Sequence, residues 1–208
     1  MNFLEKYGLK IIFILFLIFS YSITAETKKL LILGDSISAG YGIKESKNWV
    51  QLLETSFNLS GTKLKIINSS VSGDTTIGGL SRIKSDLQEY KPNYVLVELG
   101  GNDALRGYPI EKIKKNLIKI IDTSLDAEAH PIIMQIRIPP NYGKNYVAAF
   151  ESIYSEIAEE KNIPKLTFLL EKVALDNDLM QLDGIHPNQK AQRIIADQVK
   201  KELLNILK

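Results

Sequence analysis

Short apolar runs alternate with longer amphipathic stretches over most of this chain. The runs are hydrophobic nearly throughout, as strands buried on both faces of a sheet are; they cover residues 29–33, 64–68, 94–99, 132–136 and 166–170. The other stretches repeat apolar residues every three to four positions, which predicts helices; they cover residues 49–59, 77–90, 110–127, 147–161 and 189–207. This alternation favours right-handed crossovers and one α/β domain, a parallel sheet with helices on both faces.

The first 25 residues have the pattern of a secretory signal peptide. Lys6 and Lys10 supply a basic region, residues 11–19 are continuously apolar, and Ala25 offers a small residue for cleavage. The apolar run is short for a membrane span, which needs ~20 residues. We therefore expect an exported, periplasmic protein with a mature domain of residues 26–208 and no stable membrane insertion. An uncleaved N-terminal anchor is the alternative.

Composition removes several classes of function. The 208 residues include 26 basic and 24 acidic side chains, and no basic stripe favours nucleic-acid binding. The chain has no cysteine, hence neither a disulfide nor a lipoprotein attachment site. Without cysteine or a His-Glu-x-x-His motif, the sequence gives little support for a metal site.

Polar segments follow the predicted strands, where open parallel sheets bind ligands. Loops after successive strands can converge at one sheet edge; the segments concerned are Gly34-Asp35-Ser36, Ser72-Gly73-Asp74, residues 100–103, residues 138–143 and Asp183-Gly184-Ile185-His186.

Ser36 is the candidate nucleophile and His186 the candidate base. A serine hydroxyl needs a neighbouring base, and a third group must orient that base. Only two histidines are present, and His186 follows Asp183 by three residues. Pro187 keeps His186 out of a helix, while Gly184 permits a tight turn between the carboxylate and the ring. The alternatives are a turn or helix-capping role for Ser36 and a surface loop or metal ligation for the Asp/His pair.

Acyl transfer also needs hydrogen-bond donors for the oxyanion. Gly73 can bring its N–H close to a reacting carbon, Asn102 can add a side-chain amide, and the Ser36 N–H would be the third donor. Taken singly, Gly73 and Asn102 are equally compatible with ordinary turns.

Three further polar residues have other predicted roles. We interpret His130 as a loop residue at the opposite end of the sheet, and Asp35 and Asp103 as side chains that fix loop hydrogen bonds. The Gly-x-Ser-x-Gly elbow of ordinary α/β-hydrolases is absent, which argues against that fold but not against serine catalysis.

The four segments around these residues resemble the sequence blocks of the SGNH (GDSL-type) hydrolases. The similarity extends over residues 26–208 and includes Gly34-Asp35-Ser36-Ile37, Gly73, Gly101-Asn102-Asp103 and Asp183-Gly184-Ile185-His186, with Ile37 where the family name has leucine. The resemblance implies a three-layer α/β/α sandwich with a five-stranded parallel sheet.

The resemblance also implies roles and substrates. Ser36 would be the nucleophile, His186 the base and Asp183 its orienting carboxylate, with an oxyanion hole made by Ser36 N–H, Gly73 N–H and Asn102. Relatives hydrolyse acyl thioesters, lysophospholipids and small aryl esters without a metal or organic cofactor. We therefore expect a monomeric acylhydrolase that acts on small-molecule esters or thioesters.

A fatty chain would lie in a groove between the loops that follow the third and fourth strands. The predicted apolar wall consists of Leu105, Tyr108, Ile138, Pro139 and Tyr142, each of which could equally be covered by loops. Three other functions stay open: a carbohydrate acetylesterase, a peptidase, and a non-catalytic carrier of fatty acids or lysolipids.

Overall fold

The structure, a computed structural model, describes residues 27–207. The predicted signal peptide lies outside the described residues. Within them, five parallel strands form one sheet in the order β2-β1-β3-β4-β5. Their bounds are Lys28–Gly34 for β1, Leu64–Asn68 for β2, Tyr94–Glu98 for β3, His130–Met134 for β4 and Lys165–Leu166 for β5.

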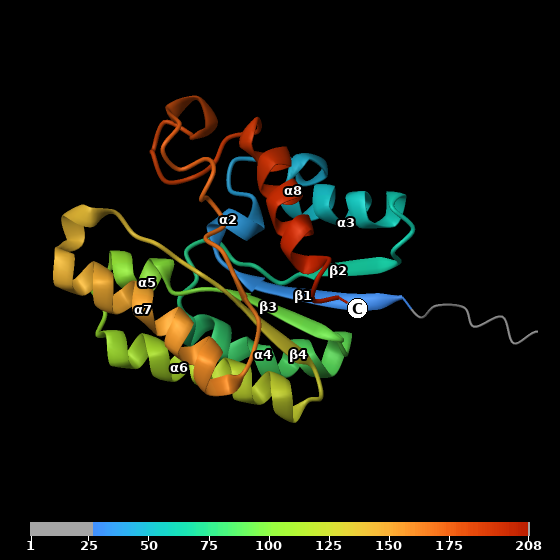
Figure 1. Ribbon diagram of the computed structural model, residues 1–208, viewed down its shortest axis with the longest axis horizontal. Helices are drawn as coiled ribbons and strands as arrows, with labels where there is room; N and C mark the ends of the chain where they lie inside the picture. The colour runs from blue at the N-terminus through green and yellow to red at the C-terminus, as the bar shows by residue number, and fades with distance from the viewer. Residues whose placement is uncertain (1–26, 208) are drawn as a thin grey trace, which may run out of the picture.

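Helices cover both faces of the sheet (Figure 1). One face carries α3 (Trp49–Leu59) and α8 (Ala191–Leu203), and the other carries α4 (Thr76–Tyr90), α6 (Ile110–Asp126) and α7 (Lys144–Lys161). Two short helices, α2 (Ser36–Ala39) and α5 (Gly101–Leu105), follow β1 and β3, and 3₁₀ turns span Glu45–Lys47, Pro140–Tyr142 and Asn177–Leu179. The predicted three-layer α/β/α sandwich with a five-stranded parallel sheet is confirmed.

The central strands β1, β3 and β4 are hydrophobic on both faces because each face packs against its own helices. Along β1, Leu30 and Ile32 join the apolar core under α3 and α8, while Leu31 and Leu33 join the core under α4, α6 and α7. Successive side chains of a strand point to opposite faces, so a buried central strand needs apolar residues at every position. This explains the unbroken apolar runs in the sequence.

The strand order places three loops together at the carboxyl edge. β1 lies between β2 and β3 in the sheet. Its last residue, Gly34, pairs with Glu98 at the end of β3. The chain order reverses at β1, the kind of switch point where open α/β sheets bind ligands. The residues that follow β1, β2 and β3 are therefore neighbours in space.

Two sequence predictions at the strand ends are wrong. The fifth strand was expected over residues 166–170, but β5 ends at Leu166. The backbone N–H of Thr167 donates to Glu202 of α8 at 2.8 Å, so the chain leaves the ladder there, and Leu169 and Leu170 enter the core from a turn. His130, expected in a loop, is instead the first residue of β4, paired with Tyr94.

The helix boundaries differ from the prediction by a few residues. α7 begins at Lys144, three residues earlier than expected, and α8 covers only Ala191–Leu203 of the expected residues 189–207. None of the helices within residues 27–207 is both long and apolar enough to cross a bilayer.

Candidate active site

Ser36 lies on the turn where β1 leaves the sheet. It is the first residue of α2, and Asp35 caps this helix by accepting the Ile37 N–H at 3.0 Å. An aspartate at this position satisfies one of the free N–H groups of the first turn, which stabilises a helix of only four residues. The cap fixes the Ser36 backbone at the carboxyl edge, with the side chain half-buried.

The structure brings Ser36 and His186 into contact across 150 residues of sequence. Ser36 Oγ lies 2.9 Å from Nε2 of His186, and Nδ1 of the same ring lies 2.7 Å from Oδ2 of Asp183. A carboxylate on Nδ1 holds the imidazole with its proton on that nitrogen, which leaves Nε2 free to accept the serine proton. The arrangement is that of a Ser-His-Asp triad.

A tight loop builds the Asp183–His186 pair. Oδ1 of Asp183 accepts the backbone N–H groups of Ile185 and His186, both at 2.9 Å. Gly184 has a φ of +69°, a conformation that glycine adopts without strain. The backbone N–H of His186, with those further hydrogen bonds, lowers the pKa of Asp183 to about 2, so the carboxylate stays charged beside the imidazole.

Two further side chains, Gln181 and Tyr41, join the loop of Asp183 and His186 (the base loop) to the segment that follows Ser36 (the nucleophile loop). The Gln181 amide donates to the carbonyls of Tyr41 at 2.8 Å and Pro187 at 3.1 Å. The ring of Tyr41 lies against that of His186, with centroids 4.5 Å apart. The role of each residue arises from contacts between distant parts of the chain, which no local pattern in the sequence reveals.

The candidate oxyanion donors lie on the three adjacent loops. Gly73 is the third residue of a turn closed by the Asp74 N–H on the Val71 carbonyl at 3.0 Å, and its φ is +78°. A type II turn requires this conformation at its third position, which favours glycine. Among the hydrogen bonds of the described residues, the N–H groups of Gly73 and Ser36 have no acceptor. Both are therefore free to bind an anion.

Asn102 has an oriented side chain. Its Nδ2 donates to Oδ2 of Asp35 at 3.1 Å, which leaves the second amide hydrogen for another acceptor. The neighbouring Asp103 accepts the N–H of Thr76 at 2.8 Å and its hydroxyl at 2.6 Å, joining α5 to the start of α4. Asp35 and Asp103 thus fix loop hydrogen bonds, as predicted.

A buried glutamate supports the nucleophile turn from below. Glu98 is only 2% exposed, and its Oε2 accepts the Ser38 hydroxyl at 2.7 Å and the Asp35 N–H at 3.3 Å. Burial raises the pKa of Glu98 well above the usual range, and it raises the pKa of Asp35 to about 6. The sequence did not indicate this role, because a single acid within an apolar strand has no partner that local spacing would reveal.

The five predicted groove residues have mixed environments. Ile138 is 7% exposed and packs with Leu105 in the core on the α7 side of the sheet. Tyr108 and Tyr142 are exposed, and so is Pro139, which follows Ile138 in the chain. The hydroxyl of Tyr146 in α7 donates to the Tyr108 carbonyl at 2.7 Å, which joins the loop after α5 to α7. Their contact with an acyl chain stays a prediction.

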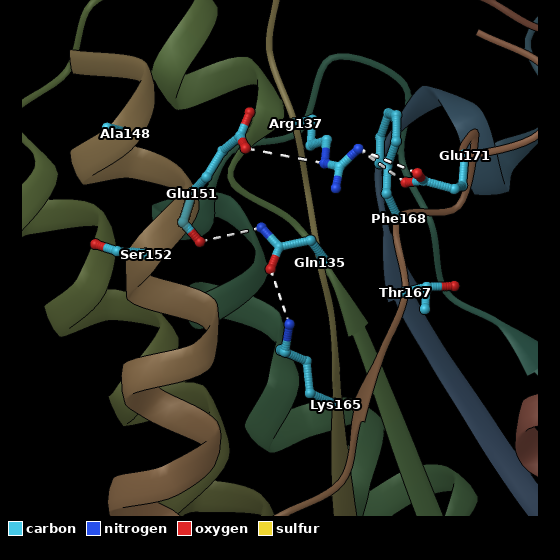
Figure 2. A pocket seen from close by; sticks show the side chains of 9 residues that line it. All are labelled: Gln135, Arg137, Ala148, Glu151, Ser152, Lys165, Thr167, Phe168 and Glu171. Atoms are coloured by element: carbon cyan, nitrogen blue, oxygen red, sulfur yellow. Dashed lines mark hydrogen bonds and ion pairs between the residues drawn. The ribbon is translucent and has the colours of Figure 1, made fainter. Parts of the chain in front are cut away.

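A separate cavity of about 550 Å³ lies alongside α7 and the segment after β5 (Figure 2). Its polar groups are already paired: Gln135 bonds the Glu151 carbonyl and Lys165, each at 3.1 Å, and Arg137 pairs with Glu171 at 3.0 Å. None of the predicted site residues lines it. Residues 27–207 contain no cluster of three or more acidic or histidine side chains that could hold a metal ion.

The fold and site define the class of protein. A parallel sheet of order 2-1-3-4-5 has a Ser-His-Asp arrangement at its carboxyl edge, and Ser36 lies on a Gly-Asp-Ser turn rather than a Gly-x-Ser-x-Gly elbow. This is a serine hydrolase on a flavodoxin-like sheet. The chain belongs to the GDSL-like Lipase/Acylhydrolase family, whose sequence profile matches residues 32–194.

Several relatives match nearly the whole chain. The thioesterase 1/protease 1/lysophospholipase L1 of Escherichia coli K12 is 44% identical over 189 residues, covering 91% of this chain and 89% of that protein. An arylesterase of Vibrio mimicus is 44% identical over 181 residues, covering 87% and 90%. The crystal structure of the esterase EstA from Pseudoalteromonas, inhibited by monoethylphosphonate, superposes with a TM-score of 0.85 at 40% identity, covering 86% of this chain and 98% of that one.

Proposed function

We propose that this protein is an exported serine acylhydrolase that cleaves carboxylic esters and thioesters through an acyl-serine intermediate. The observation that carries the proposal is the 2.9 Å contact between Ser36 Oγ and His186 Nε2, with Asp183 on the opposite ring nitrogen. Membership of an acylhydrolase family supports the reaction type.

Acylation begins when Ser36 Oγ attacks the acyl carbon and Nε2 of His186 takes the serine proton. The carbonyl electron pair moves to oxygen, and that oxyanion is bound by the free N–H groups of Ser36 and Gly73 and the amide of Asn102. Collapse of the tetrahedral intermediate breaks the C–O or C–S bond, and the imidazolium protonates the departing alcohol or thiol.

Deacylation repeats the same steps with water as the nucleophile. The water oxygen bonds to the acyl carbon while His186 takes a proton from the water. The bond from the acyl carbon to Ser36 Oγ then breaks, and Ser36 Oγ recovers that proton from His186. Asp183, held ionised by its backbone hydrogen bonds, stabilises the imidazolium that forms in both halves of the reaction.

Ser36→Ala tests the catalytic role directly. We expect it to lower ester hydrolysis by about 10⁴-fold or more, because the residual rate comes from binding and the oxyanion donors alone. The assay uses the purified mature protein on aryl esters, lysophospholipids and acyl-CoAs of graded length, with acetylated sugars as a further arm. Hydrolysis unchanged in the variant would refute the proposal, and activity confined to acetylated sugars would replace the substrate class.

We propose aryl esters, lysophospholipids and acyl thioesters as substrates, since relatives are named thioesterase, lysophospholipase and arylesterase. The acyl chain would lie against Leu105, Tyr108, Ile138, Pro139 and Tyr142. Ile138→Ala is expected to change the chain-length profile while leaving the rate on a short ester within about twofold, because the side chain would contact only the longer chains. Equal losses on short and long substrates would reject this groove.

Export is proposed from the sequence pattern of residues 1–25 alone. Expression of the full chain followed by N-terminal sequencing of the periplasmic protein tests it. We expect the mature protein to begin at or near residue 26; a full-length protein retained in the membrane fraction would favour the uncleaved anchor.

A further inference from the structure

Packing of neighbouring atoms against Gly73 does not fix its position. The residue is exposed, and a side-chain carbon built there would meet only one atom, a guanidinium nitrogen of Arg106, at 4.0 Å. An oxyanion donor must nevertheless be held in place before the charge develops, since its contribution depends on preorganisation. The groups that hold the residues around Gly73 therefore decide where its N–H points.

One guanidinium, that of Arg82 in α4, holds most of this loop. Its Nε and Nη2 donate to Oδ2 of Asp74 at 3.1 and 2.8 Å, and its Nη1 donates to the Ser69 hydroxyl at 2.7 Å. These partners lie at the two ends of the loop that contains Gly73. Nη1 also contacts Asp86 one helical turn further along α4, at 3.3 Å.

The same guanidinium also reaches the nucleophile strand. Nη2 lies 3.5 Å from the carbonyl of Gly34, the last residue of β1, two positions before Ser36. The ion pair with Asp74 is mostly shielded from solvent, with side-chain exposures of 20% for Arg82 and 11% for Asp74. A planar guanidinium with five fixed donors is suited to such simultaneous contacts, and a lysine ammonium is not.

We propose that Arg82 is a positioning residue that sets the Gly73 N–H against Ser36 Oγ for oxyanion binding. The inference rests on the proposed acylhydrolase function and goes beyond it, because Arg82 lies outside the sequence motifs of the site. Arg106 contacts the same turn through a single exposed bond to the Gly73 carbonyl at 3.2 Å, so it provides less constraint.

Arg82→Met removes the guanidinium while keeping the aliphatic stem. We expect kcat for an aryl ester to fall about 10- to 100-fold with KM changed less than threefold. Complete loss of one oxyanion donor costs about 10²–10³ in kcat, and here the donor is displaced rather than removed. Affinity for an alkylboronic acid, whose boron bonds Ser36 Oγ in a tetrahedral adduct, should fall in parallel. Arg82→Lys should recover only part of the loss.

The matched control is Arg193→Met, which breaks an exposed pair with Asp197 on α8. It should keep wild-type kcat and boronate affinity. Assays are run below the melting temperature of each variant, so that a loss of stability alone does not lower the rate. An Arg82→Met protein that is folded and retains wild-type kcat and boronate affinity would overturn the inference.

A second variant tests the same inference if Arg82→Met does not fold. Asp74→Asn breaks the same bridge from the loop side and should give the same loss of kcat with little change in KM; retained kcat there would also overturn the inference. The double variant Arg82→Lys/Asp74→Asn should lose less than the product of the single effects, because both changes act on one contact. Wild-type protein without ester hydrolysis would refute the proposed function itself, whereas an active wild type with fully active variants refutes only the role of Arg82.

Discussion

The side of the site that holds Ser36 (the nucleophile side) and the side that holds His186 (the base side) both contain carboxyl groups, but in opposite environments. On the nucleophile side, Asp35 and Glu98 are 5% and 2% exposed, and burial raises the pKa of Asp35 to about 6. On the base side, the Asp183 side chain is 38% exposed, and backbone hydrogen bonds lower its pKa to about 2. The carboxylate of the proposed triad lies near water, and the carboxyl groups that hold the nucleophile turn lie inside the protein.

The two sides are also held together differently. The nucleophile turn depends on contacts between distant elements, such as that of Ser38 in α2 with Glu98 in β3, which are 60 residues apart. The pair of Asp183 and His186 depends on hydrogen bonds within four residues of one loop. Changes on the base side should therefore lower activity with little loss of stability, and changes beneath the nucleophile should lower stability as well.

The largest expected effect is on the base side. His186→Ala should lower kcat about 10⁴- to 10⁶-fold, and Asp183→Asn about 10⁴-fold, because the serine loses its base or that base loses its orienting partner. Melting temperatures should stay within a few degrees of wild type. Kinetics and thermal denaturation measure both, with His130→Ala as the control histidine. Unfolding of either loop variant would contradict the comparison.

The next effect is on the nucleophile side. A methyl group at Gly34 would meet Oε2 of Glu98 at 2.6 Å and two serine side chains at 2.9 Å. Gly34→Ala should destabilise the protein by about 1–3 kcal/mol through overpacking and lower kcat by displacing Ser36. Urea denaturation measures the stability. Gly61→Ala, where the added methyl has open space and only the φ of +84° is unfavourable, should cost about 1 kcal/mol and leave kcat unchanged.

Glu98→Gln separates the charge of the buried acid from its shape. A carboxyl whose pKa is raised on folding stabilises the protein fully below its ordinary pKa, and this contribution is lost as pH rises through the folded value. For Asp35 the window runs from about pH 4 to pH 6, and Glu98 shifts in the same direction. We expect the melting temperature of Glu98→Gln to equal that of wild type near pH 4 and to lie a few degrees above it at pH 8.

Thermal denaturation across this pH range measures the effect. The exposed Glu159 provides the control, since Glu159→Gln should leave the pH dependence of melting unchanged. If the melting temperatures of wild type and Glu98→Gln change with pH in the same way, the buried acid adds no pH dependence to the stability.

The smallest expected effect concerns the contact that joins the two sides. Gln181→Ala removes the bonds to the Tyr41 and Pro187 carbonyls and should lower kcat about two- to tenfold by loosening His186 against Ser36. Steady-state kinetics measure it, with Gln51→Ala in α3 as the control. A loss as large as that of Asp183→Asn would mean that the base loop depends on this bridge rather than on its own hydrogen bonds.

Local patterns in the sequence predicted most of the fold. Strands buried on both faces and helices with one apolar face each leave a periodicity that can be read directly, and four strands and all five long helices were found within a few residues. The fifth strand was misplaced because Leu169 and Leu170 are buried in a turn, and burial alone does not distinguish a strand from a loop. α2 and α5 were missed because helices of four and five residues have no periodicity.

The sequence by itself determined the sheet, the chemistry-bearing segments at the strand ends and the choice of Ser36, Asp183 and His186 as candidates, because these depend on residue type and local spacing. Only the tertiary structure decided how the site is held. Glu98 beneath Gly34, Gln181 across two loops and Arg82 on the Gly73 loop act through contacts between residues far apart in the chain, and such contacts are created by the packing of the folded sheet and helices.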